Sequence, residues 1–276
     1  MPREVMDLAE PVDQAITLRG LSGRDIPARL RRVGRGRRAV FLHGMLAHNA
    51  HWEPLLAKVR DRWQCTMLEL PLIDLRNEDC SIDGVTHLTS RFIERFAPAP
   101  AVYLGSSFGG HVALRIALER SELVSGLILA GAAGVAERPI AGDLMMKPTK
   151  EWIRERVGAM FYNKHKHITE PELERVYGEL SDRDRARAII RLTRTSRKEY
   201  MGDRLPEIKA PALIVWGRQD AITPPEAAQE FASRLPDARI VWLDECSHAP
   251  MVEHPERFGQ AMNDFCDELD RRDASA

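Results

Sequence analysis

Residues 101–110 read AVYLGSSFGG, an apolar run that passes through a turn of small residues into a helical pattern. Gly105 and Gly109 each lie two positions from Ser107. Glycine at both places lets a strand and the following helix approach closely, so that the serine side chain projects from a tight turn between them. The stretch therefore predicts a strand, a sharp turn that carries Ser107, and a helix. A glycine-rich phosphate loop is the alternative, although the sequence here contains neither GxGxxG nor GxxxxGK followed by Ser or Thr.

Similar short apolar runs recur on both sides of this stretch, each bounded by glycine, proline or a charged residue. They cover residues 38–44, 65–71, 124–131, 211–217 and 238–244. Runs this short, apolar on both faces, are typical of buried parallel strands. Helical spacing of apolar residues marks the segments 107–120, 225–235 and 255–269. The alternation predicts an α/β fold with a doubly wound, mostly parallel sheet, and residues 14–33 are predicted as an antiparallel hairpin at one edge.

Residues 132–205 interrupt this alternation, because they contain several helical patterns and no strand pattern. We interpret them as a helical cap, or lid, inserted between two sheet strands. Residues 1–131 and 206–276 then form the core that carries the sheet. Ligands bind at the carboxyl ends of the strands in such sheets, and a cap inserted there is placed to cover them.

The overall composition is that of an ordinary globular chain. Of 276 residues, 44% are hydrophobic and 29% charged, and the formal net charge is −1. This balance gives no reason to expect nucleic acid or a membrane as a partner, and it favours a small-molecule substrate. The four cysteines are widely spaced and contain no CxxC pair, which suits a reducing compartment. We expect a soluble, cytoplasmic protein; the sequence does not indicate its oligomeric state.

Two further polar residues follow strand patterns at the sheet edge where Ser107 is expected. Asp220 comes after the run 211–217, and His248 comes after the run 238–244. A serine hydroxyl needs a base to become a nucleophile, and the base needs an orienting carboxylate. Ser107, Asp220 and His248 occur in the chain order expected for such a triad on this kind of sheet. They are the predicted catalytic residues.

A second turn supports this interpretation. His43-Gly44-Met45 ends the strand pattern 39–42, where the first donor of an oxyanion hole is expected. The backbone N–H groups of Met45 and Phe108 are predicted to hold the oxyanion, while His43 turns the loop.

Together these features resemble the α/β-hydrolase superfamily, in its single-domain, esterase-like branch with a helical cap. The resemblance spans nearly the whole chain, from the His43-Gly44 turn to the segment 247–258. It implies acyl transfer from a carboxylic ester or thioester, with no metal and no organic cofactor. One loop departs from the pattern: relatives often show Asp-x-x-Gly-x-Gly-x-Ser after the strand ending at Leu70, whereas residues 69–79 read ELPLIDLRNED.

Two alternatives of different classes stay open. A carbon–carbon bond hydrolase of the meta-cleavage type uses the same triad, but such relatives commonly carry asparagine before the nucleophile and tryptophan after the histidine. Here Ser106 and Ala249 occupy these positions. A perhydrolase side activity would also use this triad. The second alternative is a ligand-binding receptor or interaction protein that kept the fold without turnover.

Other candidate site residues receive simpler interpretations. His48 and His51 have a spacing that metal ligands use, but nothing in the sequence completes a site, so we expect the polar start of a helix. His111 lies four residues after Ser107 and is expected to pack inside the scaffold. In the cap, a basic cluster is a candidate for meeting a substrate carboxylate. It consists of Arg191, Arg194 and Arg197.

Overall fold

The computed structural model describes residues 8–135 and 148–275. Its centre is an eight-stranded sheet with the order β1-β2-β4-β3-β5-β6-β7-β8. The strands are β1 Leu8–Arg19, β2 Asp25–Gly34, β3 Arg37–Leu42, β4 Trp63–Glu69, β5 Ala101–Ser106, β6 Val124–Ala130, β7 Ala212–Gly217 and β8 Ala238–Leu243. The pairs from β4 through β8 are parallel, and β1 and β2 form the antiparallel hairpin at one edge.

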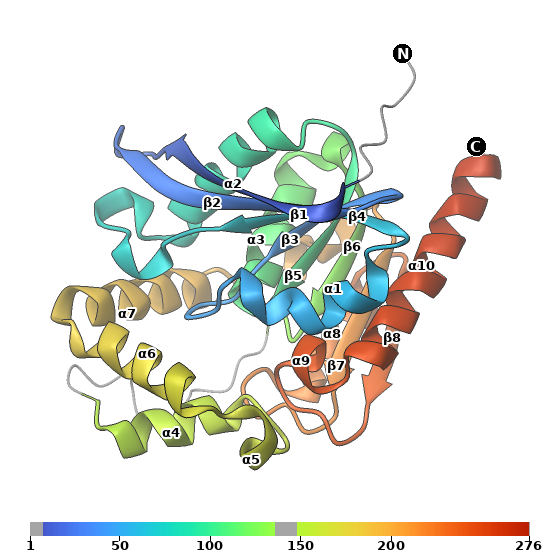
Figure 1. Ribbon diagram of the computed structural model, residues 1–276. Coiled ribbons are helices and arrows are strands. Elements are labelled where there is room, and N and C mark those ends of the chain that lie inside the picture. Colours follow the sequence, from blue (N-terminus) through green and yellow to red (C-terminus); the bar gives the residue numbers. More distant parts are fainter. Residues whose placement is uncertain (1–7, 136–147, 276) are drawn as a thin grey trace.

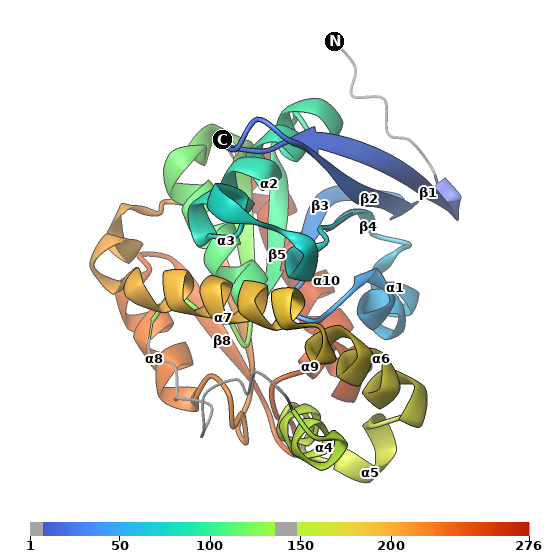
Figure 2. The same ribbon diagram turned by 90° about the vertical axis from the view of Figure 1, so that its left-hand side faces the viewer.

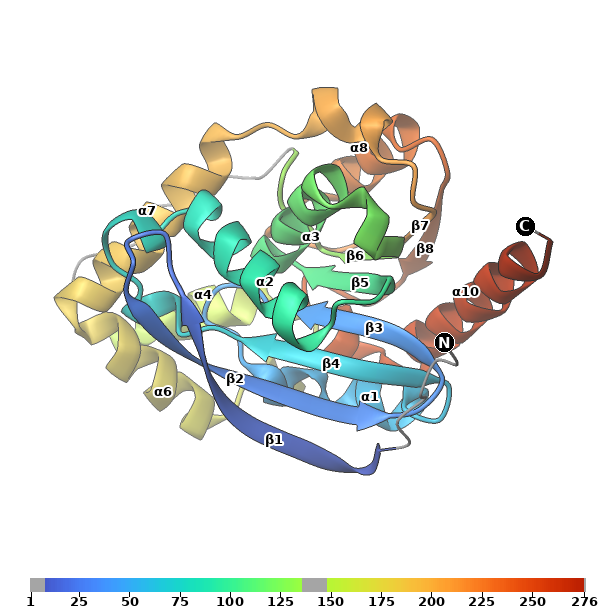
Figure 3. The same ribbon diagram turned by 90° about the horizontal axis from the view of Figure 1, so that it is seen from above.

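Helices cover both faces of this sheet (Figure 3). One face packs on α2 Ile82–Phe96, α3 Phe108–Glu119 and α8 Pro225–Arg234; the other packs on α1 Glu53–Val59 and α10 Pro255–Ser275. Consecutive residues of the central strands enter opposite cores: Leu127 and Leu129 face the first layer, and Ile128 faces the second. This is why these strands are apolar throughout rather than alternating.

The predicted α/β fold is confirmed. Each predicted strand is present with its ends shifted by at most two residues, and the hairpin predicted at 14–33 lies at the sheet edge. Short elements complete the described part of the chain. They are the 3₁₀ helices η1 Asn49–Trp52, η2 Leu72–Asp74, η3 Asn77–Asp79, η4 Ser121–Leu123 and η5 Gly202–Glu207, and the short helix α9 Pro250–Glu253.

The described residues between β6 and η5 form four helices and no strand. These cap helices are α4 Lys150–Ala159, α5 Lys164–His167, α6 Glu170–Ser181 and α7 Arg183–Lys198. They gather at one end of the molecule (Figures 1 and 2). Their own small core includes Ile153, Val176 and Ile189, and Met45 and Leu46 of the sheet domain pack against it. The cap boundaries at 132 and 205 stay a prediction, and residues 136–147 within them lie outside the described residues.

Two observations concern membrane-spanning helices and the state of the cysteines. Across the two described segments, none of the helices is both long and apolar enough to cross a bilayer. All four cysteines are free and buried, and burial raises the pKa of the Cys65 and Cys246 thiols. The cysteines therefore pack as small apolar groups, as the sequence predicts, and the cytoplasmic location stays a prediction.

Candidate active site

The turn between β5 and α3 holds Ser107 in a strained backbone conformation. Its φ is 52° and its ψ is −122°, outside the regions that non-glycine residues ordinarily occupy. A Cβ on Gly105 would lie 2.4 Å from the Gly109 carbonyl oxygen, and one on Gly109 would lie 2.1 Å from the Leu42 carbonyl oxygen. Only glycine fits at both positions. The sharp turn predicted from residues 101–110 is present, and it leaves Ser107 partly accessible.

His248 and Asp220 form a buried pair at the same edge of the sheet. His248 Nδ1 lies 2.9 Å from Asp220 Oδ2, and the two side chains are 4% and 0% exposed. The other carboxylate oxygen, Oδ1, accepts the backbone N–H groups of Ile222 and Thr223 at 2.8 and 2.9 Å. These bonds fix the carboxylate, which in turn fixes the imidazole so that Nε2 is the nitrogen left for chemistry.

Thr223 is a further member of this network that the sequence did not indicate. Its hydroxyl oxygen lies 2.9 Å from Asp220 Oδ2, 3.1 Å from His248 Nδ1 and 3.1 Å from the Gly131 carbonyl oxygen. The Thr223 hydroxyl thus links the Asp220–His248 pair to Gly131, the residue that directly follows β6. No sequence signal marks Thr223, because a threonine before Pro224 is an ordinary turn residue.

Gly131 lies so close to the pair that its substitution is expected to disturb the site. It has φ +53°, and an added Cβ would lie 2.9 Å from His248 Nδ1 and 3.2 Å from Asp220 Oδ2. We expect Gly131→Ala to lower kcat/KM for an ester by about 10²-fold, the usual effect of displacing a catalytic group by about 1 Å. Gly178→Ala is the control, because a Cβ there meets nothing within 4 Å. Equal kcat/KM values for the two variants would contradict the prediction.

The His43-Gly44-Met45 turn lies directly against Ser107. A Cβ on Gly44 would lie 3.1 Å from the Ser107 Cβ. His43 Nε2 accepts the Leu70 N–H at 3.2 Å, so the ring proton is assigned to Nδ1, which donates to the Gly44 carbonyl at 2.8 Å. Burial lowers the pKa of His43, which keeps the ring neutral. His43 therefore holds the loop, and the N–H of Met45 is directed away from this bond.

Two cavities meet at Ser107 and His248. The larger has a volume of about 1050 Å³ including its mouth, and it extends beneath the cap. Its walls are mainly apolar, with Trp152, Val176 and Ile189 among them. The smaller, of about 530 Å³, lies on the side of His43 and Gly44. A group bound at Ser107 therefore has room to extend in two directions.

Of the three cap arginines singled out in the sequence, Arg197 lines the larger cavity, and Arg191 and Arg194 do not. Arg156 of α4 lines the cavity as well. Its guanidinium lies 5.2 Å from the Trp152 ring centroid. The sequence did not single out Arg156, because its place on the cavity side of α4 depends on how that helix packs.

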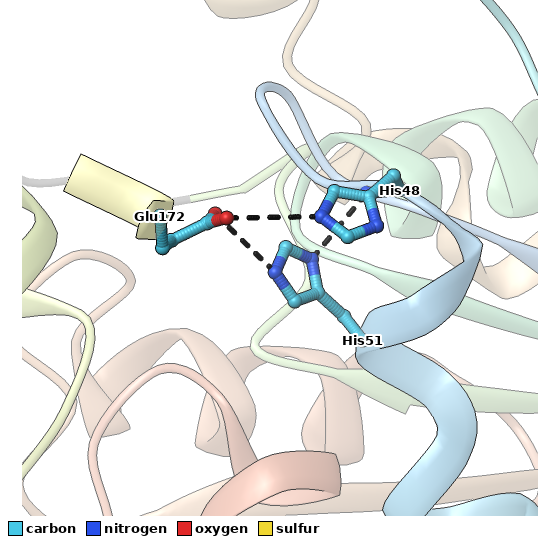
Figure 4. Close-up of side chains that lie close together, drawn as sticks. All are labelled: His48, His51 and Glu172. Carbon is cyan, nitrogen blue, oxygen red and sulfur yellow. Dashed lines mark hydrogen bonds and ion pairs between the residues drawn. The ribbon is translucent and has the colours of Figure 1, made fainter. Parts of the chain in front are cut away.

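Figure 4 shows a cluster that joins the core to the cap. His48 caps η1, as the predicted helix start requires. The sequence indicates no third side chain beside the two histidines, whereas α6 places Glu172 there. His51 Nε2 lies 3.4 Å and His48 Nε2 lies 3.8 Å from the Glu172 carboxylate. The two histidines and Glu172 lie more than 120 positions apart in the chain, so no local sequence pattern indicates this contact.

The donor set of this cluster has the composition of a metal site. The His48 backbone N–H, however, donates to His51 Nδ1 at 3.3 Å, which assigns the ring proton to the Nε2 that faces Glu172. Arg175 also binds both oxygens of Glu172. We therefore interpret the cluster as a hydrogen-bonded bridge between core and cap.

The cap also contacts the loop that carries His248. The His248 backbone N–H donates to the Met160 carbonyl at 3.0 Å. Glu253, which is 8% exposed, accepts the Ser247 N–H at 2.7 Å and the Tyr162 N–H at 2.7 Å. One buried carboxylate thus joins the histidine loop to the turn between α4 and α5. The sequence does not indicate this role of Glu253, because its partners lie in another segment of the chain.

His111 is fully buried, as expected, and its Nδ1 lies 2.9 Å from the Ser196 hydroxyl of α7. It packs inside the scaffold and links α3 to the cap.

Comparison with known proteins gives one family match that covers most of the chain. A profile described as "Alpha/beta hydrolase family" matches residues 39–261. A 2-hydroxy-6-oxononadienedioate/2-hydroxy-6-oxononatrienedioate hydrolase of Paraburkholderia phymatum is 31% identical over 174 residues, which are 59% of this chain and 60% of that protein. The chain therefore matches only about 60% of the length of this relative.

Other relatives match over more of their length. A pimeloyl-[acyl-carrier protein] methyl ester esterase of Nitrosomonas europaea is 26% identical over 254 residues, 82% of this chain and 94% of that protein. Among solved structures, an alpha/beta hydrolase enzyme from a lagoon-sediment metagenome (Mar Chica, Morocco) superposes with a TM-score of 0.71 at 26% identity. It covers 88% of this chain and 96% of its own.

Proposed function

This chain belongs to the alpha/beta hydrolase family, and on that premise we propose that it is a serine hydrolase cleaving a carboxylic ester or thioester of a small molecule. The observation that carries the proposal is the buried Asp220–His248 pair, whose imidazole opens onto the same two cavities as Ser107. A strained serine, an oriented imidazole and a cavity between them are the parts that acyl transfer requires.

The proposed reaction has two steps. Ser107 Oγ attacks the carbonyl carbon, and His248 Nε2 takes the serine proton and delivers it to the leaving group. Asp220 stabilises the imidazolium, and the N–H groups of Met45 and Phe108 bind the oxyanion. In the described residues, neither N–H has another acceptor. Water activated by His248 then attacks the acyl-enzyme and releases the acid.

The larger cavity supports a substrate with a sizeable apolar group. Trp152, Val176, Leu180 and Ile189 surround the space beneath the cap. Each methylene buried there contributes roughly 0.8 kcal/mol to binding. We therefore expect medium-chain esters to react faster than acetate.

Narrowing this cavity is expected to shift the chain-length preference. Val176 is 3% exposed and lines the cavity, so Val176→Phe removes room for about two methylenes. The kcat/KM ratio of octanoate to acetate should then fall by about 15-fold, as roughly 1.6 kcal/mol requires. Val12→Phe on the exposed side of β1 is the matched control. A ratio that is the same in both variants would contradict the assignment of the cavity to the acyl chain.

A carbon–carbon bond hydrolase of the meta-cleavage type is the second candidate, since the relative in Paraburkholderia phymatum is named as a hydrolase of 2-hydroxy-6-oxononadienedioate and 2-hydroxy-6-oxononatrienedioate. Against it, Ser106 and Ala249 occupy the positions where asparagine and tryptophan are expected. A panel of p-nitrophenyl esters of increasing length, run beside a ring-cleavage dienone, separates the two. Turnover of the dienone without turnover of any ester would favour the carbon–carbon bond hydrolase over the ester hydrolase.

The same panel tests whether Arg197, which lines the larger cavity, binds a substrate carboxylate. Equal rates for neutral esters and for esters that end in a carboxylate would contradict this role of Arg197.

A further inference from the structure

The loop between β3 and η1 carries Met45, and its geometry needs support from outside the loop. Leu46 has φ 58°, in the left-handed region that residues other than glycine seldom adopt. From the core side, His43 binds the Gly44 carbonyl. From the cap side, the contact is made by Arg175 of α6, whose Nη2 donates to the Leu46 carbonyl at 2.8 Å.

Two carboxylates fix the Arg175 guanidinium in place. Glu172 accepts Nε at 3.0 Å and Nη2 at 2.5 Å. Glu179 accepts Nη1 with both oxygens, at 2.7 and 2.8 Å. The two oxygens of Glu179 share one N–H of Nη1, so with the bond to Leu46 these contacts use four of the five N–H groups of the side chain. The guanidinium cannot turn without losing a bond, so the second N–H of Nη2 is directed at the Leu46 carbonyl.

The carboxylate on the core side of Arg175 is itself held charged. Burial pushes the pKa of Glu172 upward, but hydrogen bonds from His48, His51 and Arg175 outweigh it and hold the pKa well below its usual range. The side chains of Glu172, Arg175 and Glu179 are 26%, 29% and 18% exposed. A partly desolvated ion cluster in which one guanidinium binds two carboxylates is rigid compared with an exposed ion pair.

The hydrogen bond from Arg175 to Leu46 is the first link of a hydrogen-bond chain that passes through two peptide groups. The peptide that contains the Leu46 carbonyl also contains the Ala47 N–H, which donates to the Gly44 carbonyl at 3.3 Å. The peptide that contains the Gly44 carbonyl also contains the Met45 N–H. In a trans peptide the C=O and N–H point in opposite directions, and hydrogen bonds in such a chain polarise one another. The hydrogen bond that Arg175 donates to the Leu46 carbonyl therefore acts along this chain on the Met45 N–H.

We propose that Arg175 is a positioning residue for the oxyanion hole, through which the cap orients and polarises the Met45 N–H. The inference rests on the proposed function, in which Met45 is an oxyanion donor. The cap then completes the catalytic machinery of the core, besides covering the cavity.

The test compares Arg175→Met with Arg154→Met, using a p-nitrophenyl ester and a boronic acid that places an oxygen in the oxyanion hole. Arg154 is a cap arginine in an exposed pair with Glu170. Full loss of an oxyanion donor lowers kcat by about 10²–10³-fold. For a residue acting through that donor we expect kcat to fall by about tenfold or more, with KM within about twofold. The boronic acid should bind more weakly by a similar factor.

Arg175→Lys keeps the charge and one donor, and it should restore part of the lost kcat. If Arg175→Met does not fold, Arg175→Lys carries the test, with kcat reduced by about threefold or more at unchanged KM. Wild-type kcat and boronic acid affinity in the Arg175 variants, or a loss confined to KM, would overturn the inference. Failure of the proposed function would be distinct: the wild-type protein would neither hydrolyse the ester nor react with a fluorophosphonate.

Discussion

Ser107→Ala is expected to lower kcat for ester hydrolysis by about 10⁶-fold, the loss typical of removing a serine nucleophile. The reason is that, in our proposal, Ser107 supplies the hydroxyl that attacks the carbonyl, and it lines the same two cavities as His248. Alanine has the same backbone restrictions at φ 52°, so the thermal midpoint should change little. The measurement is kcat with a p-nitrophenyl ester, together with a melting curve.

Ser233→Ala on the exposed side of α8 is the matched control, and it should keep wild-type kcat. A Ser107→Ala protein that is folded and keeps more than about 1% of wild-type kcat would be inconsistent with Ser107 as nucleophile.

Asp220→Asn is expected to lower kcat/KM by about 10⁴-fold, because it reverses the tautomer of His248. Oδ1 of Asp220 accepts two backbone N–H groups, so an asparagine there keeps its oxygen at that position. Its NH₂ group then faces His248 Nδ1 and donates to it, which moves the ring proton to Nε2. A protonated Nε2 cannot accept the proton of Ser107.

The control for this variant is Asp203→Asn, since that aspartate is 82% exposed on η5. It should leave kcat/KM unchanged. A loss of less than about tenfold in Asp220→Asn would show that another group orients the histidine.

The sequence was sufficient for most of the sheet and for the order of the candidate triad. Parallel strands buried on both faces give apolar runs that can be read directly, as in residues 212–217. The turn at Ser107 is readable because sterics permit only glycine at 105 and 109. Helix α2 was not predicted, although its buried positions such as Val85, Leu88 and Phe92 follow helical spacing.

The contacts between cap and core could not be predicted from the sequence. Glu172 and Arg175 lie on an amphipathic helix where charged residues normally face solvent. Their partners His48 and Leu46 are more than 120 positions away in the chain. Only the packing of α6 over the loop after β3 brings them together. Glu253 and Thr223 also take their roles from neighbours that no local pattern marks.

The measurement that tests the central claim most directly is the site of covalent reaction with a fluorophosphonate. Cleavage after Arg95 and Arg115 releases one tryptic peptide that contains both Ser106 and Ser107. The account predicts one phosphonyl group per chain, located by fragmentation on Ser107 and absent from the Ser107→Ala protein. A wild-type protein that stays unlabelled, or that carries the group on another residue, would contradict it.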